Sequence, residues 1–272
     1  MFGAIRKEVH TLSSAVNPAW NWRSLRPIVN PILPTENVLP EVARDFMRCA
    51  GEVAGGTFII YGGALNDLAN GRTPKDFDGH CLTRNHPLIA MYRVESWAKQ
   101  QGYEVSHYRR RVRLLWKRLK IGTDHGEYDI SFLQGKMALN DLVRQMADEA
   151  DVSPCARSAT ADSAFQSQRC IDGENQERLI FRPFRMDRDR FRHLDRWHKY
   201  AIVKYPDRPV VYQCADDAVL FSELDIRRSE VRALHAELSK QGEVPKNFEP
   251  FRPLMPDWYD QLLAKAKAQL TN

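Results

Sequence analysis

The sequence predicts an α+β fold in which a small mixed β-sheet is followed by a mostly helical C-terminal part. Between residues 57 and 133, short apolar runs of strand length alternate with stretches whose apolar residues recur at helical spacing. Beyond residue 136, helical spacing dominates. These patterns divide the chain into an irregular N-terminal arm, a sheet-containing head and a helical part, at residues 1–37, 38–136 and 137–272.

The head is expected to form five strands, with its helices on one face of the sheet. Pro40 suits the first turn of a helix that Gly55-Gly56 ends, and Asn70-Gly71 is a typical end for a second, shorter helix. The expected strands are residues 57–61, 76–82, 103–108, 111–119 and 127–133, with a turn over 121–126, and the expected helices are 40–54, 64–70 and 86–101.

The regions on either side of the head are less regular. Prolines punctuate the arm, which indicates a wrapping segment rather than a domain. The polar stretch 151–180 shows no clear periodicity. In the C-terminal part, helices are expected at residues 137–149, 187–205, 215–241 (as one helix or two) and 256–270.

With 43% hydrophobic and 28% charged residues, the composition is that of a soluble globular protein. The five cysteines are scattered without a CxxC pair, which argues against a disulfide scaffold or a zinc knuckle and favours reduced thiols. No apolar run approaches the length of a membrane span, and the first residues lack the apolar core of a signal peptide. We therefore expect a cytoplasmic protein with no membrane partner. The net charge of +5 is compatible with a nucleic-acid partner but does not establish one.

A double glycine, Gly62-Gly63, separates the first expected head strand from the next helix. Glycines there allow backbone amides to turn inward, and the start of a helix adds its positive end, so the turn suits a triphosphate. The alternative is a tight strand-to-helix connection that binds no ligand. The carboxylates that follow favour the first interpretation.

Asp76 and Asp78 stand two residues apart at the start of an expected strand, so their side chains point to the same side. Two like charges held that close repel unless a cation lies between them, and a divalent metal is the usual one. Asp129, between Tyr128 and Ile130, would add a third carboxylate if its strand pairs beside that of Asp76. The alternative is a pair of solvated loop aspartates. Metal, phosphate turn and carboxylates together indicate phosphoryl or nucleotidyl transfer.

The run GGALNDLANGRTPKDFD, residues 62–78, resembles the head signature of the polymerase-beta-type nucleotidyltransferase superfamily. More narrowly, it is similar to the CCA-adding enzyme and poly(A) polymerase family, and with Asp129 the resemblance covers about residues 57–133. It implies transfer of a nucleoside monophosphate from ATP or CTP to an acceptor, most simply a tRNA-like RNA 3′ end, with release of pyrophosphate.

The resemblance also implies roles for residues. Asp76 and Asp78 would hold two Mg²⁺ ions, or Mn²⁺ in their place, and Asp129 would join them and assist the attacking 3′-hydroxyl. This chain departs from the family at Asn66, where an arginine is usual, and Arg72 and Lys75 are the candidate substitutes. The implied nucleotide-binding residues are Gly62, Gly63, Asn66, Asp67, Arg72 and Lys75.

Two basic clusters, within residues 108–120 and 182–205, are candidates for RNA contacts. The alternatives are a solvated sheet face for the first and core packing with Asp–Arg surface pairs for the second. The residues proposed to contact RNA are Arg111, Arg113, Arg192, Arg196 and Lys199.

Two other functions remain open from the sequence. One is nucleotidyl transfer to a protein or a small molecule. The other is an inactive head kept as an RNA-binding or regulatory module, which Asn66 and the unusual Gly79-His80 would suit. The presence of all three carboxylates argues against inactivity.

Overall fold

The computed structural model describes residues 32–107, 117–135, 138–182, 194–213, 215–242, 249–255 and 260, which form two compact units. The head unit comprises Val29–Ala150 and Pro154–Ile171. The C-terminal unit contains Asp151–Ser153 and the described residues from Asp172 onward. The head unit thus starts before residue 38 and extends beyond residue 136, the two boundaries expected from the sequence.

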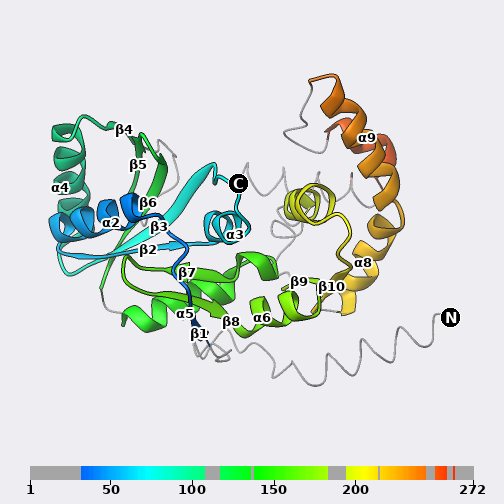
Figure 1. Ribbon diagram of the computed structural model, residues 1–272, viewed down its shortest axis with the longest axis horizontal. Coiled ribbons are helices and arrows are strands. Elements are labelled where there is room, and N and C mark those ends of the chain that lie inside the picture. The colour runs from blue at the N-terminus through cyan, green and yellow to red at the C-terminus, as the bar shows by residue number, and fades with distance from the viewer. Residues whose placement is uncertain are drawn as a thin grey trace. The chain divides into compact units, whose positions relative to one another are not determined.

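The α+β class with a mixed sheet is confirmed, but the sheet is larger than expected (Figure 1). It has eight strands in the order β1-β8-β7-β2-β3-β6-β5-β4. Among these, β3 and β6 pair in parallel and the other neighbours are antiparallel. The strands are β1 (Ile32–Thr35), β2 (Gly56–Tyr61), β3 (Asp76–Thr83), β4 (Glu104–His107), β5 (Lys117–Thr123), β6 (Gly126–Gln134), β7 (Arg157–Ala159) and β8 (Ala164–Ser167).

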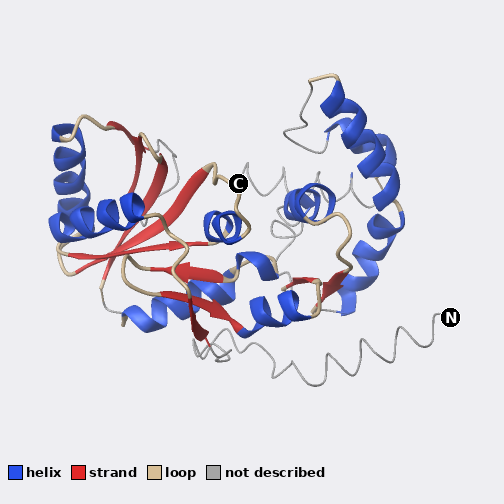
Figure 2. Ribbon diagram, viewed as in Figure 1, coloured by secondary structure: helices blue, strands red, loops and turns tan. Residues whose placement is uncertain are grey.

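Helices cover both faces of this sheet, so the expectation of a single covered face was wrong (Figure 2). On one face, α2 and α4 bury the main core, which includes Phe46, Phe77 and Tyr128. On the other, α5 packs Leu142 and Val143 against Ile59 of β2. The second face was missed because β7 and β8, which extend the sheet beside α5, lie in a polar stretch without a readable period. The helices of this unit are α2 (Glu41–Ala54), α3 (Gly63–Ala69), α4 (Pro87–Gln100), α5 (Leu139–Glu149) and α6 (Gln168–Asn175), the last of which continues into the C-terminal unit.

Two further strand assignments need correction. Residues 32–35, expected within an irregular arm, form β1 and pair with β8, Ile32 opposite Ser167. The strand expected at 111–119 is instead β5, which runs on to Thr123 because Leu119 and Ile121 alternate into the core. The turn before β6 is correspondingly short. The other residues of the expected strand, together with most of the arm and the helix expected at 256–270 apart from Asp260, lie outside the described residues.

The C-terminal unit mixes strands with helices in its described part. Parallel strands β9 (Leu179–Phe181) and β10 (Val210–Tyr212) accompany a π-helix, η2 (His198–Lys204). The helix expected at 215–241 is two helices, α8 (Ala215–Ile226) and α9 (Arg228–Lys240). A 3₁₀ helix, η3 (Glu249–Leu254), follows. A mostly helical C-terminal part is therefore too simple a description of these residues.

Side-chain hydrogen bonds hold η2 against α8 and α9. Trp197 Nε1 donates to Asp225 Oδ1 at 2.8 Å, and the Arg228 guanidinium donates to the carbonyls of Ala201, Tyr205 and Pro206. The Ala201 carbonyl of η2 and the two carbonyls that directly follow this helix thereby gain hydrogen-bond partners. Within the described part of the chain, no helix is both long and apolar enough to cross a bilayer.

Acid is expected to destabilise the C-terminal unit through His198, which packs against His235 of α9 at 5.1 Å and Phe251 of η3 at 4.9 Å between ring centroids. Burial, and secondarily His235, lower the pKa of His198 to about 4. The unfolded chain therefore takes up a proton that the folded chain resists, and stability present above about pH 6.5 is lost as the pH falls toward 4. Allowing for residual solvent, the loss is about 2 kcal/mol.

Urea unfolding at pH 7 and pH 4.5 measures this loss. We expect His198→Phe, which keeps an aromatic ring but cannot ionise, to reduce the pH dependence, and the exposed His86→Phe to leave it unchanged. An identical pH dependence in wild type and His198→Phe would refute the assignment.

Candidate active site

The carboxylates singled out in the sequence lie on adjacent, parallel strands of the head. In the β3–β6 register, Asp76 is opposite Glu127 and Asp78 is opposite Asp129. Alternation directs these four side chains to one face of the sheet, while Phe77 and Tyr128 point into the core on the other face. The strand of Asp129 therefore does pair beside that of Asp76.

Aromatic packing on the core side fixes which face of β3 and β6 points into the core. The Phe77 and Tyr128 rings stack at 4.9 Å between centroids, and Tyr128 stacks on Phe46 of α2 at 4.0 Å. Because Phe77 separates Asp76 from Asp78, locking its ring into the core holds both carboxylates on the opposite face.

Arg118 of β5 reaches this carboxylate face, although its position within a basic run of the sequence did not indicate a role in the site. Its Nε and Nη2 donate to the two oxygens of Asp129, the second at 2.6 Å, and Nη2 lies 3.6 Å from Asp78 Oδ1. The Asp129 side chain is 7% exposed and that of Asp78 is 47% exposed. Partial burial opposes the charge of Arg118, but the hydrogen bonds and charges of Asp129 and Asp78 outweigh it and raise the pKa of Arg118.

Lys120 lies two residues further along β5 and forms an ion pair with Glu127. The hydrogen bond that Lys120 Nζ donates to Glu127 Oε1 is the main cause that raises the pKa of Lys120. Two carboxylates of β6 are thus matched by two cations of β5. The signal in the sequence was Arg-x-Lys before a turn and Glu-x-Asp after it. The basic residues expected on this segment, Arg111 and Arg113, lie outside the described residues.

The double-glycine turn has the geometry its residues predict. Gly62 precedes α3 with φ +82°, a backbone conformation that favours glycine, and its N–H donates to Arg157 O of β7 at 3.1 Å. A Cβ built at Gly62 would meet no heavy atom within 4 Å, so open space lies beside the turn. A ligand could approach the backbone here.

The other residues of the expected nucleotide-binding set have different positions. Asn66 is 1% exposed and lies in the interior, where Asn70 Nδ2 donates to its carbonyl at 2.8 Å. Asp67 is buried and accepts from Arg72 Nε at 3.1 Å, which ties the loop after α3 to the helix. Lys75 is exposed directly before β3. Of this set, the glycine turn and Lys75 are the parts that a solvent-borne ligand can reach most directly.

His80, on β3 two residues after Asp78, is buried and packs its ring 5.0 Å from that of Tyr61. Burial, and then the charge of Arg118, lower the pKa of His80 to about 4. The ring is neutral at physiological pH, which agrees with a structural role.

The candidate RNA contacts of the C-terminal unit are already engaged where the structure describes them. Arg196 Nε donates to Asp151 Oδ2 at 3.3 Å, and Arg182 Nη2 donates to the other oxygen at 3.1 Å. Lys199 Nζ lies 5.7 Å from the Tyr200 ring centroid. Arg192 lies outside the described residues. For Arg196, the alternative of an Asp–Arg pair is the observed one.

The carboxylate face fits a divalent metal in part. Hard carboxylate oxygens suit Mg²⁺, and Asp76 and Asp78 present theirs on one face of a well-packed strand. Both oxygens of Asp129 are instead bonded to Arg118. Accordingly, the described residues contain no group of three His, Cys, Asp or Glu side chains that could hold a metal ion. The expected cluster of Asp76, Asp78 and Asp129 is not assembled in this conformation.

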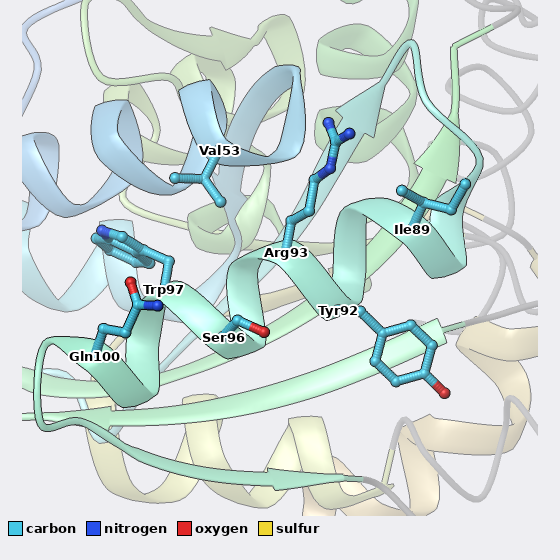
Figure 3. Close-up of a pocket in the computed structure, with 7 residues that line it drawn as sticks. All are labelled: Val53, Ile89, Tyr92, Arg93, Ser96, Trp97 and Gln100. Atoms are coloured by element: carbon cyan, nitrogen blue, oxygen red, sulfur yellow. The ribbon is translucent and has the colours of Figure 1, made fainter.

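A pocket of about 600 Å³ lies elsewhere on the head, lined by residues of α4 and by Val53 of α2. Figure 3 shows Tyr92, Arg93 and Trp97 of α4 lining it, with Val53 of α2. Its lining contains no carboxylate, so it has none of the chemistry of the β3–β6 face.

Comparison with solved structures identifies the fold. A tRNA-processing enzyme in an apo form matches with a TM-score of 0.52 and 13% identity, over 79% of this chain and 60% of that one. A CCA-adding enzyme in complex with CTP matches with a TM-score of 0.51 and 12% identity, over 82% of this chain and 54% of that one. The chain shares the fold of a CCA-adding enzyme.

The shared fold confirms, at the level of architecture, the resemblance identified from residues 57–133. No protein-family model and no curated protein matches the sequence. The chain spans 54 to 60% of the length of these two structures.

Proposed function

We propose that the chain is a metal-dependent nucleotidyltransferase, which transfers a nucleoside monophosphate from ATP or CTP to an RNA 3′ end and releases pyrophosphate. The observation that carries the proposal is the alignment of Asp78 with Asp129 on adjacent parallel strands, with Asp76 on the same face. Two further observations support the proposal. The chain shares the fold of a CCA-adding enzyme, and the Gly62-Gly63 turn directly follows β2, the strand that pairs with β3, which carries Asp76 and Asp78.

The residues of the head have distinct roles in this proposal. Asp76 and Asp78 hold the Mg²⁺ ions, or Mn²⁺, which when bound neutralise the triphosphate and favour attack by the acceptor hydroxyl. The triphosphate lies in the open space beside the Gly62-Gly63 turn, and Lys75 adds a positive charge at the exposed edge. Asp67 positions Arg72 and the loop between α3 and β3. Asp129 orients the acceptor hydroxyl and accepts its proton, once it is released from Arg118.

RNA is the proposed acceptor, and the C-terminal unit with its helices is the part proposed to bind it. The solved structures of similar fold include a tRNA-processing enzyme, and the chain carries a net charge of +5. The described cysteines are free thiols, which supports a reducing, cytoplasmic location. Transfer of the nucleotide to a protein or a small molecule is the second candidate, because Arg196, one of the candidate RNA contacts, is paired with Asp151.

The proposal is tested by incubating the protein with each of the four α-³²P-labelled nucleoside triphosphates, Mg²⁺ and total cellular RNA. The matched control is the double variant Asp76→Ala, Asp78→Ala. We expect label from ATP or CTP to enter RNA with the wild type alone. Label on protein or on a small molecule would support the second candidate, and no incorporation anywhere would indicate a binding module.

A further inference from the structure

The carboxylate that completes the proposed site is already neutralised by the chain itself. The Arg118 guanidinium donates in a fork to both Asp129 oxygens, and its Nη2 is also 3.6 Å from Asp78 Oδ1. Such a fork-to-carboxylate pair is the strong geometry for an arginine ion pair. Since Asp129 is 7% exposed, little water is left to share the charge. Arg118 is therefore the principal counter-ion of this carboxylate.

A divalent cation and Arg118 need the same oxygens. A metal ion bound by Asp129 must lie close to its carboxylate oxygens, where the two guanidinium nitrogens now are. The two cations would also repel each other across Asp78 and Asp129. Coordination of a metal ion by Asp129 and the Arg118–Asp129 ion pair therefore compete for the same oxygens.

We propose that Arg118 is a resident counter-ion that a divalent metal ion must displace from Asp129, so that Arg118 lowers the metal affinity of the site. This inference rests on the proposed function. While Arg118 holds Asp129, that carboxylate is a weaker proton acceptor for an acceptor hydroxyl, because the guanidinium pairs its charge and takes one acceptor position on each oxygen. Arg118 thus acts as a positioning residue that keeps the site charge-balanced and Asp129 less reactive until metal arrives.

Binding of Mn²⁺ alone tests the proposal without any assay of activity. Free Mn²⁺ is followed by electron paramagnetic resonance in titrations of the full-length wild type and Arg118→Gln. Removing the competing cation is expected to tighten Mn²⁺ binding about tenfold. Loss of binding in Asp78→Asn identifies the β3–β6 face as the site that the titration reports.

Lys120→Gln is the matched control, because it removes a cation from the same face of the same strand without touching the Asp129 hydrogen bonds. We expect its Mn²⁺ affinity to change by no more than about threefold. Arg118→Lys keeps the charge but loses the fork, and its affinity should lie between those of wild type and Arg118→Gln. If Arg118→Gln fails to fold, Arg118→Lys replaces it as the test variant, and its Mn²⁺ affinity should exceed that of the wild type.

Thermal unfolding gives a second readout. Arg118→Gln removes the main hydrogen-bond partner of Asp129, so without metal the variant should unfold at a lower temperature than the wild type. Saturating Mn²⁺ should raise the unfolding temperature of the variant more than that of the wild type. Equal Mn²⁺ affinities in wild type and Arg118→Gln would refute the role of Arg118. The same conclusion would follow if Lys120→Gln bound Mn²⁺ as tightly as Arg118→Gln does. Neither result would contradict the proposed function. If neither the wild type nor Arg118→Gln binds Mn²⁺, both the role of Arg118 and the metal-dependent mechanism are refuted.

Discussion

Asp78→Asn is expected to reduce nucleotidyl transfer by about 10³-fold or more while leaving the head folded. The substitution keeps the size of the side chain but removes the negative charge that would bind metal on the carboxylate face. The side chain is 47% exposed, so no buried charge is created and the core behind Phe77 is untouched. Initial rates of label transfer with saturating triphosphate, compared with the circular dichroism spectrum of each variant, measure the effect.

Asp162→Asn is the matched control for this variant. Asp162 is a largely exposed carboxylate of the same unit that pairs with Arg48, away from the β3–β6 face. Its loss should change the rate by less than about twofold. A rate for Asp78→Asn within threefold of wild type would remove Asp78 from the catalytic machinery.

Phe46→Ala is expected to lower the free energy of unfolding of the head by about 3–5 kcal/mol. Phe46 is 4% exposed and stacks on Tyr128, and its ring also lies near Trp97 and Phe58, at 5.6 and 6.4 Å between centroids. Truncation leaves a cavity against the strand that carries Asp129 on its other face. Equilibrium urea unfolding followed by near-ultraviolet circular dichroism, which reports these rings, measures the loss.

Val42→Ala provides the comparison on the same helix. Val42 is 53% exposed, so its truncation should cost no more than about 0.5 kcal/mol. If Phe46→Ala costs less than about 1 kcal/mol, the aromatic stack does not support β6 as described.

The elements between residues 40 and 101 could be predicted because each carries its own local signal. Apolar periodicity marked α2 and α4, and Gly55 with its left-handed backbone ended α2 where a glycine was expected. β1, β7 and β8 carry no such signal, since they are three or four residues long and owe their pairing to neighbours distant in sequence. β5 was misplaced because its charged residues are satisfied by β6, across the turn, rather than by local partners.

The candidate site likewise has one part that the sequence predicts and one part that it does not. The side to which Asp76, Asp78 and Asp129 point follows from strand alternation, and the residues alone predict it. The pairing of Arg118 with Asp129 depends on the register between β5 and β6, in which Arg118 is opposite Ser131, next to Asp129 on the same face. A register is set by the whole sheet, so a basic run in the sequence does not specify which of its members meets the carboxylate.

A crystal structure of the protein with Mn²⁺ and a non-hydrolysable ATP or CTP analogue, from data collected at the manganese absorption edge, would test the proposed site. We expect an anomalous peak bound by the carboxylates of Asp76 and Asp78, with the triphosphate against Gly62-Gly63 and Arg118 withdrawn from Asp129. Nucleotide and manganese bound together at any other place on the chain, with the Arg118–Asp129 pair intact, would refute this assignment of the active site.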